Sequence, residues 1–211
     1  ASANYRSLSS MQDVDRAVKK IHQYLTKIDI LINNAGFGLY KHVLEHSDGE
    51  MVSMAMVNFI SPIILVKRLL PLMPRGSTVV MVITAGIHVL MRDLPLYDAT
   101  KIALHYSSEA LRYELKRCGI NLLAVYPSAV KTEFHRRAGR ELESGLEPIH
   151  AAKAILKAVE KKKKRIYIPW HLSTTRIFGP YLPYPWPPSP PSTYSEGFHG
   201  VLSTYQLYAM L

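Results

Sequence analysis

The stretch STVVMVITAGIHVLMRDLPLYDATKIAL, residues 77–104, sets the fold of this chain and begins with a run of apolar residues. Residues 79–83 are all apolar and mostly β-branched, a pattern typical of a strand that is covered on both faces. An irregular segment follows, and Pro95 is well placed to begin a helix. The stretch therefore predicts a buried strand that ends in the hydroxyl group of Thr84, then a loop, then a helix.

That helix carries Tyr97 and Lys101, which are four residues apart and therefore share one face. An ammonium group beside a phenol, together with the positive end of the helix dipole, favours the phenolate and lowers the phenol pKa from about 10. We expect Tyr97 to give and take a proton near neutral pH. The alternative is an ordinary tyrosine and a solvated lysine on a surface helix.

The rest of the chain alternates between helical and extended patterns. An alternation of this kind implies a parallel sheet, whose ligands gather at the carboxyl ends of the strands. Asn33, Asn34 and Gly36 stand at such a strand end. We expect strands within residues 28–36, 77–84, 120–126 and 165–169, and helices over residues 10–25, 51–73, 95–117 and 151–159.

The long helix over residues 51–73 contains Asn58, followed at the fourth position by Pro62. Because proline has no N–H, the carbonyl group of Asn58 lacks its usual helical partner, and a water molecule can take its place. A kinked core helix with one solvated amide is the plainer interpretation.

The segment YDATK resembles the Tyr-x-x-x-Lys signature of the short-chain dehydrogenase/reductase family. In that family a catalytic serine lies at a strand end thirteen residues before the tyrosine, and the same count from Tyr97 reaches Thr84. The NNAG segment, residues 33–36, is similar to a second family signature, which orders the central sheet and borders the adenosine part of the cofactor. VNFISP, residues 57–62, looks like the family segment in which an asparagine holds a proton-relay water.

A fourth resemblance is PSAVKT, residues 127–132, which is similar to the family's Pro-Gly-x-Val-x-Thr turn beside the nicotinamide. Ser128 replaces the glycine of that turn. A serine there is unfavourable if the position needs a positive φ or a very close approach.

The resemblance covers residues 7 to about 170 and implies an α/β fold, with a Rossmann-like parallel sheet and helices on both faces. It implies hydride transfer between NADP or NAD and a small carbonyl or alcohol substrate, with Tyr97 as general acid/base. Family members commonly pair through two long helices, which implies a homodimer or homotetramer. The implied catalytic residues are Tyr97, Lys101, Thr84 and Asn58, and the implied cofactor-binding residues are Asn34, Ala35, Gly36, Lys101, Tyr97, Pro127, Val130 and Thr132, with Ser7 and Leu8 as weaker candidates.

The chain departs from the family pattern at both ends. The family opens with a glycine-rich turn that holds the cofactor diphosphate, whereas here no glycine precedes Gly36. By analogy about fifty residues are absent. The chain is then either a fragment of a longer enzyme or a shortened product that binds cofactor poorly. We expect a dehydrogenase-like domain over residues 1–170 and a tail over residues 171–211, whose proline-dense residues 180–192 favour an extended conformation.

Composition limits the class of protein. A chain of 211 residues with 48% hydrophobic content can bury one core. The single Cys118 rules out an internal disulfide framework and fits a reducing compartment. Residues 1–20 lack the apolar core of a signal peptide, and the longest apolar run, residues 51–66, is too short to span a bilayer. We expect a cytoplasmic protein without a transmembrane segment.

The net charge of +10 suggests an anionic partner, but much of it sits in the KKKKR run at residues 161–165. Cations at a helix C-terminus complement the helix dipole, so we interpret the run as a helix end and expect no nucleic-acid partner. A second basic group, Arg136, Arg137 and Arg140, falls in an expected loop and could meet an anionic ligand.

One competing motif is HVLEH, residues 42–46, which matches the H-x-x-E-H pattern of inverted zinc peptidases. In that pattern His42 and His46 hold zinc and Glu45 is the base. Because turn-forming residues follow at once, we expect no metal site. A further alternative is a catalytically impaired remnant of the family that acts through binding or oligomerisation.

Overall fold

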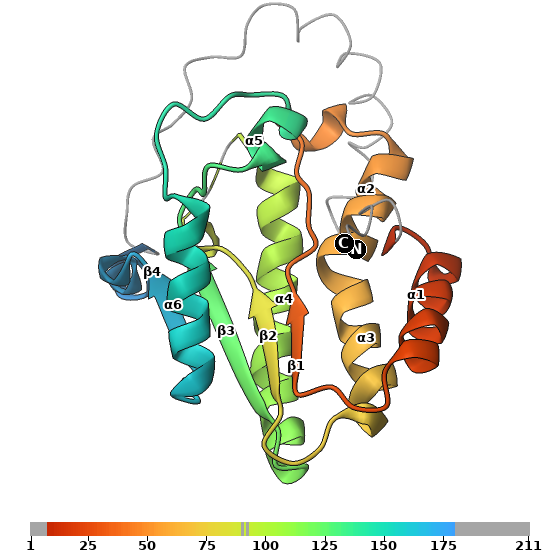
Figure 1. Cartoon of the computed structure of the whole chain (residues 1–211). Coiled ribbons are helices and arrows are strands. Elements are labelled where there is room, and N and C mark those ends of the chain that lie inside the picture. The colour runs from red at the N-terminus through yellow and green to blue at the C-terminus, as the bar shows by residue number, and fades with distance from the viewer. Residues whose placement is uncertain (1–7, 90, 92, 180–211) are drawn as a thin grey trace, which may run out of the picture. The chain divides into compact units, whose positions relative to one another are not determined.

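The fold is a parallel β-sheet with helices packed on both of its faces. The computed structural model describes residues 8–89, 91 and 93–179. Within these residues the sheet has four strands, all parallel, in the order β1-β2-β3-β4. The strands, visible in Figure 1, are β1 (Ile30–Asn33), β2 (Thr78–Val82), β3 (Asn121–Pro127) and β4 (Arg165–Ile168). The α/β class and the Rossmann-like parallel sheet predicted from the sequence are confirmed.

Helices connect the strands. The α-helices of the described residues are α1 (Met11–Tyr24), α2 (Asp48–Ala55), α3 (Ser61–Leu69), α4 (Pro95–Arg117), α5 (Glu133–Ala138), α6 (Pro148–Glu160) and α7 (Thr175–Phe178). The 3₁₀ turns are η2 (Val43–Glu45), η4 (Leu70–Leu72), η5 (Ala85–His88) and η6 (Trp170–Thr174), and η3 (Met56–Ile60) is a π-helix.

The two faces of the sheet bury separate clusters of apolar side chains. On one face, α1, α3 and α4 pack against alternate residues of β2 and β3, which include Val79, Met81, Leu122 and Ala124. On the other face α6 covers Val80, Leu123 and Val125. Figure 1 shows α6 in front of the sheet and α4 behind it. The alternation of side chains along a strand explains why both clusters come from the same two strands.

Strand β1 lies at the edge of the sheet and pairs with β2. Leu31 packs into the core beneath α1, α3 and α4. Its neighbours Ile30 and Ile32 point to the opposite face and are 45% and 51% exposed. The described residues therefore leave part of the α6 face of the sheet uncovered.

Residues 48–72 form one helical stretch made of α2, η3, α3 and η4. It is the one helix of the described residues that is long and apolar enough to cross a membrane by length and composition. The apolar run predicted at residues 51–66 lies inside this longer helix, which starts at Asp48, where Ser47 caps it by accepting from the Glu50 N–H at 3.3 Å. In this domain the stretch packs against α1 and α4.

Near Asn58 the regular helix gives way to the π-helix η3. The N–H of Ser61 reaches back to the carbonyl group of Met56, five residues earlier. Because Pro62 offers no N–H to Asn58, the helix has room for this wider turn. Asn58 is fully buried within it.

The short helix α5 corrects one expectation. The sequence placed Arg136, Arg137 and Arg140 in a loop, whereas the first two lie on α5. Thr132 begins this helix, since its hydroxyl group accepts from the N–H of Phe134 at 3.3 Å. Gly139 ends the helix with a φ of 106°, a conformation that glycine favours.

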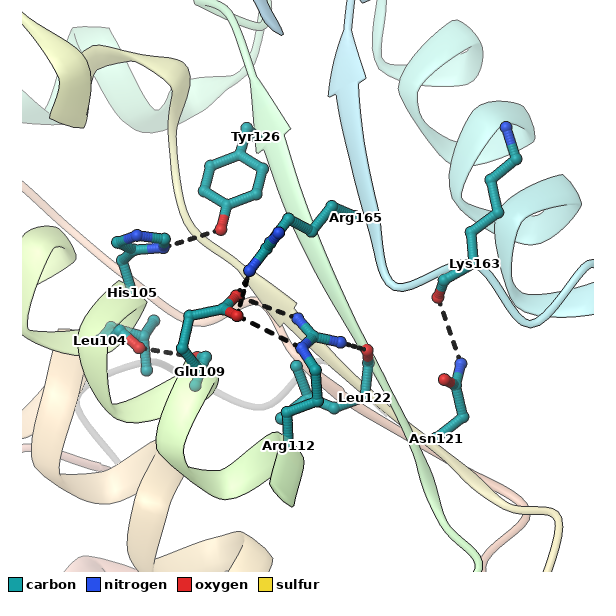
Figure 2. Close-up of polar contacts among 10 residues, drawn as sticks. Leu104, His105, Glu109, Arg112, Asn121, Leu122, Tyr126, Lys163 and Arg165 are labelled. Carbon is teal, nitrogen blue, oxygen red and sulfur yellow. Dashed lines mark hydrogen bonds and ion pairs between the residues drawn. The ribbon is translucent and has the colours of Figure 1, made fainter. Parts of the chain in front are cut away.

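A polar cluster joins α4 to the sheet (Figure 2). The carboxylate of Glu109 accepts from Arg165 Nε at 3.0 Å and from Arg112 Nη2 at 3.1 Å. Burial of Glu109 opposes its ionisation, but the hydrogen bonds from the two guanidinium groups outweigh burial and lower its pKa to about 2. His105 Nδ1 and the hydroxyl group of Tyr126 share a hydrogen bond of 2.8 Å. These contacts fix α4 across β3 and β4.

The chain continues after β4 as η6 and α7, which contact β4 and η5, respectively. The lysine run follows α6 directly, and Lys161 to Lys164 are exposed, as expected for a helix end. The proline-dense residues 180–192 lie outside the described residues. The boundary predicted at residue 170 stays a prediction.

Candidate active site

A cleft of about 1480 Å³ opens at the carboxyl ends of β1, β2 and β3. Each of these strands is followed by a segment that lines the cleft, and α4 supplies a further wall. The sequence-predicted residues that line it are Asn34, Ala35, Gly36, Thr84, Tyr97, Lys101, Pro127, Val130 and Thr132. The fold thus brings together residues from four distant parts of the sequence.

Three other predicted positions have different surroundings. Asn58 lies behind the cleft wall and is fully buried. Leu8 packs against the core, its carbonyl group accepting from Ser61 Oγ at 2.8 Å, and Ser9 lines the cleft instead. Ser7 lies outside the described residues.

Ser128 occupies its turn without backbone strain. Among the described residues other than glycine, Lys162 is the one with a positive φ, so Ser128 has a conformation open to any residue. Its N–H donates to the carbonyl group of Ile168 at 2.8 Å. The serine at the family's glycine position is therefore compatible with the turn.

Lys101 is held inside the cleft wall. Its side chain is 3% exposed, and its Nζ donates to the carbonyl group of Val82 at 2.9 Å. Burial lowers the pKa of Lys101 to about 8, so the ammonium form still dominates at neutral pH. Gly36 packs directly on this group, since a Cβ atom at residue 36 would lie 3.2 Å from Lys101 Nζ and from Asn58 Oδ1.

The side chain of Asn58 bridges the loop after β1 to α4. Its Oδ1 accepts from the N–H of Phe37 at 3.0 Å, and its Nδ2 donates to the carbonyl group of Phe37 at 2.9 Å. The same Nδ2 donates to Thr100 Oγ1 at 3.0 Å. Both N–H donors and the oxygen of the amide group are engaged, so the side chain fixes the loop that carries Gly36 against the helix that carries Lys101.

Tyr97 is covered by an aromatic ring that sequence reasoning missed. The ring centroids of Tyr97 and Phe134 are 5.1 Å apart. Burial, with a further contribution from the charge of Asp98, raises the pKa of Tyr97 above its usual range. The expected lowering by Lys101 is wrong for this structure, because Nζ points to Val82 and lies 5.7 Å from the centre of the Tyr97 ring.

Thr84 stands at the end of β2, where it caps η5. Its Oγ1 accepts from the N–H of Gly86 at 3.2 Å. Behind this turn lies the carboxyl group of Asp98, since a Cβ atom at Gly86 would be 3.4 Å from both Asp98 Oδ1 and Thr84 Oγ1. The cap holds the Thr84 hydroxyl group at the cleft wall.

The HVLEH segment, residues 42–46, forms a capped 3₁₀ turn. Val43–Glu45 is a single 3₁₀ turn, and Glu45 Oε2 accepts from the backbone N–H of His42 at 2.8 Å as part of a helix cap. His46 is buried next to α2, with its Nδ1 3.9 Å from a Glu50 oxygen. Across the part of the chain that the structure describes, no group of three His, Cys, Asp or Glu residues is placed to hold a metal ion.

Comparison with known proteins identifies the class. The sequence model of the family described as "short chain dehydrogenase" matches residues 5–143. The chain belongs to the short-chain dehydrogenase/reductase family, a family of oxidoreductases, as the sequence motifs predicted.

Among its relatives, an uncharacterized oxidoreductase of Staphylococcus aureus (strain MRSA252) is 28% identical over 158 residues, which span 74% of this chain and 68% of the relative. The 17-beta-hydroxysteroid dehydrogenase 13 of Rattus norvegicus is 26% identical over 180 residues, 83% of this chain and 60% of the rat protein. The chain thus matches only part of the length of its relatives.

Solved structures share the fold. A short-chain dehydrogenase from Sphingobium yanoikuyae in complex with NADPH superposes with a TM-score of 0.70 at 22% identity, covering 86% of this chain and 76% of that one. A short-chain dehydrogenase/reductase from Burkholderia phymatum in complex with NAD gives a TM-score of 0.73 at 19% identity, with the same coverage.

Proposed function

We propose that this chain is an NADP- or NAD-dependent oxidoreductase that interconverts a carbonyl group and an alcohol, with Tyr97 as the general acid/base. The observation that carries the proposal is the meeting of Tyr97, Lys101 and Thr84 in one cleft at the carboxyl edge of a parallel sheet. Ligands of open α/β sheets bind at this edge.

The cleft fits a dinucleotide cofactor. Its volume of about 1480 Å³ exceeds the 300–1000 Å³ or so of an ordinary small-molecule pocket. At Gly36, which lines the cleft, the absence of a side chain lets the loop pack directly against Lys101. Asn34, Ala35, Gly36, Pro127, Val130 and Thr132 would hold the cofactor, and relatives of the same fold were solved with NADPH and with NAD. When bound, the nicotinamide supplies or accepts the hydride.

Residues of this chain would donate and accept the proton of the reaction. Burial keeps the phenol of Tyr97 protonated, the form needed to donate to the oxygen of a carbonyl substrate. Thr84 would donate a hydrogen bond to the same oxygen, and the Lys101 ammonium group would bind the nicotinamide ribose, the other role that the family resemblance implies for it. Asn58 would hold the relay water at its backbone carbonyl group, because its side chain is already bonded.

Fluorescence titration with NADPH and with NADH tests the proposal directly. We expect one of the two cofactors to bind, and the absence of binding of either at millimolar concentration would end the oxidoreductase proposal for this chain. With a panel of aldehydes and ketones, Tyr97→Phe should lower kcat by at least about a hundredfold while the fold, followed by circular dichroism, is unchanged. A Tyr97→Phe variant that turns over at the parent rate would remove Tyr97 from the role of acid.

The proposed assembly is a homodimer or homotetramer in the cytoplasm. Helix α4 exposes Ile102, Tyr106 and Tyr113 along one stripe, with exposed fractions of 48%, 78% and 75%. The same observation supports the second candidate function, a family remnant that acts by binding. Light scattering measures the assembly, and a cofactor-free but stable oligomer would favour this second candidate.

A further inference from the structure

We propose that Tyr40 is a positioning residue of the active site, which holds α5 in place so that Phe134 covers Tyr97 and forms the wall of the substrate site. The substrate part of this inference rests on the proposed function. The structural part, a clasp between Tyr40 and α5, stands without it.

Tyr40 contacts both ends of α5. Near the start of the helix, its hydroxyl group and Nδ1 of His135 share a hydrogen bond of 2.8 Å. At the end of the helix, the Tyr40 N–H donates to the carbonyl group of Ala138 at 2.9 Å. Just beyond, the guanidinium carbon of Arg140 lies 4.5 Å from the centre of the Tyr40 ring.

Arg140 extends the clasp to a third segment. Its Nη1 donates to Asp93 Oδ2 at 2.6 Å, just before α4 begins. The contacts of Tyr40 and Arg140 therefore join the loop after β1, α5 and the start of α4. A helix as short as α5, six residues long, has almost no stability of its own, so such tertiary contacts decide its position.

The position of α5 determines what covers the catalytic phenol. Phe134 precedes His135 on this helix, and its ring centroid is 5.1 Å from that of Tyr97. Gly38, two residues before Tyr40, makes room for this ring, since a Cβ atom at residue 38 would lie 3.1 Å from Phe134 Cζ and 3.3 Å from Tyr97 Cβ. A shift of α5 would therefore uncover Tyr97.

The inference predicts which kinetic constant should change. Phe134 and His135 line the cleft together with Met91, so they border the space for a substrate beside Tyr97. Loosening α5 leaves in place Tyr97, Lys101 and the residues that would hold the cofactor, apart from Thr132 at the start of α5, but it disorders one wall. The Michaelis constant for the carbonyl substrate should therefore rise while kcat stays nearly unchanged.

Hydrogen exchange of the purified chain, without cofactor or substrate, tests the clasp. In Tyr40→Phe the hydroxyl bond is lost while the ring and the backbone bond remain, so amide exchange in α5 should speed up on the order of fivefold, with α4 unaffected. Tyr24→Phe, an exposed tyrosine on α1, is the matched control and should change nothing. Parent-like exchange of α5 in Tyr40→Phe would overturn the clasp.

A double-mutant cycle asks whether the two side chains act through their shared bond. We expect His135→Phe to accelerate exchange in α5 to a similar degree, and the double variant to add little to either single change. Fully additive effects would mean that Tyr40 and His135 act separately, which would overturn the clasp as described.

The kinetic test then addresses the substrate wall. Tyr40→Phe should raise KM for the carbonyl substrate on the order of fivefold, with kcat and the cofactor KM within about twofold of the parent. A loss confined to kcat would overturn the positioning role. If the parent shows no turnover with either cofactor, the proposed function fails and the substrate wall fails with it, whereas the exchange measurements still decide the clasp.

Discussion

The buried carboxyl group of Asp98 should make the stability of this protein depend on pH in an unusual direction. Asp98 lies in the first turn of α4, 5% exposed, and no side chain of the described residues donates a hydrogen bond to its oxygens. Burial raises its pKa to about 7, against an opposing contribution from the backbone of Met91. The folded chain thus keeps a proton up to neutral pH that the unfolded chain loses near pH 3.8.

The sign and the size follow from this difference. A carboxyl group with a raised pKa in the folded state contributes its stability at low pH and loses it as pH rises to about 7. At about 1.4 kcal/mol for each pKa unit, the loss between pH 5 and pH 8 is about 3 kcal/mol. This is an upper value, because the protein around an ionised carboxylate can rearrange and admit water.

Asp98→Asn isolates the effect, since it keeps the shape and removes the titration. Urea unfolding of parent and variant between pH 5 and pH 8 gives the difference in free energy of unfolding at each pH. That difference should move by about 3 kcal/mol in favour of the variant as pH rises, or about 6–12 °C in Tm for a chain of this size. The constant cost of burying the new amide group cancels in this comparison.

Asp29→Asn is the control, because the Asp29 side chain is 67% exposed and pairs with Lys27 at the surface. Its difference from the parent should stay near zero across the range. If the Asp98→Asn difference stayed constant to within about 0.5 kcal/mol, the carboxyl group would already be ionised in the folded state as well, and the reasoning would be refuted.

Two further predictions concern buried polar groups. Asn58→Ala leaves the N–H and the carbonyl group of Phe37 without their side-chain partner. Chemical unfolding should therefore show a free energy of unfolding that is lower by about 3 kcal/mol. A decrease under about 1 kcal/mol would contradict the bridging role. Burial lowers the pKa of His105, with Glu109 opposing, so stability should be full above about pH 6.5 and fall below it. In the Asp98→Asn variant, acidification from about pH 7 to pH 5 should lower Tm. Adding His105→Gln should make this decrease in Tm smaller. If the decrease were the same with and without His105→Gln, His105 would be excluded as its source.

The strands of the sheet could be predicted from the sequence because an apolar run is a local signal. Three of the four strands lie within the ranges predicted for them, and β3 extends one residue beyond its predicted range, to Pro127. A buried parallel strand shows itself as a β-branched run, whatever its neighbours are. That Thr84, Tyr97 and Lys101 line one cleft was implied by the resemblance to the family and not by these local patterns.

The details that control Tyr97 could not be predicted in this way. Helix α5 has six residues and no periodic pattern long enough to separate it from a loop. The cover that Phe134 provides, and the direction in which Lys101 points, depend on contacts between segments far apart in the chain. For that reason the predicted pKa shift of Tyr97 had the wrong direction, although the residue itself lies in the cleft.

The outer edge of β1 is open in the part of the chain that the structure describes. There β1 pairs with β2 alone and presents a row of backbone donors and acceptors on its other side, and Ile30 and Ile32 add an apolar surface beside it. Such an edge is a template for a strand of another molecule. Self-association of the chain should therefore begin at this edge, where Ile30 and Ile32 are about half exposed.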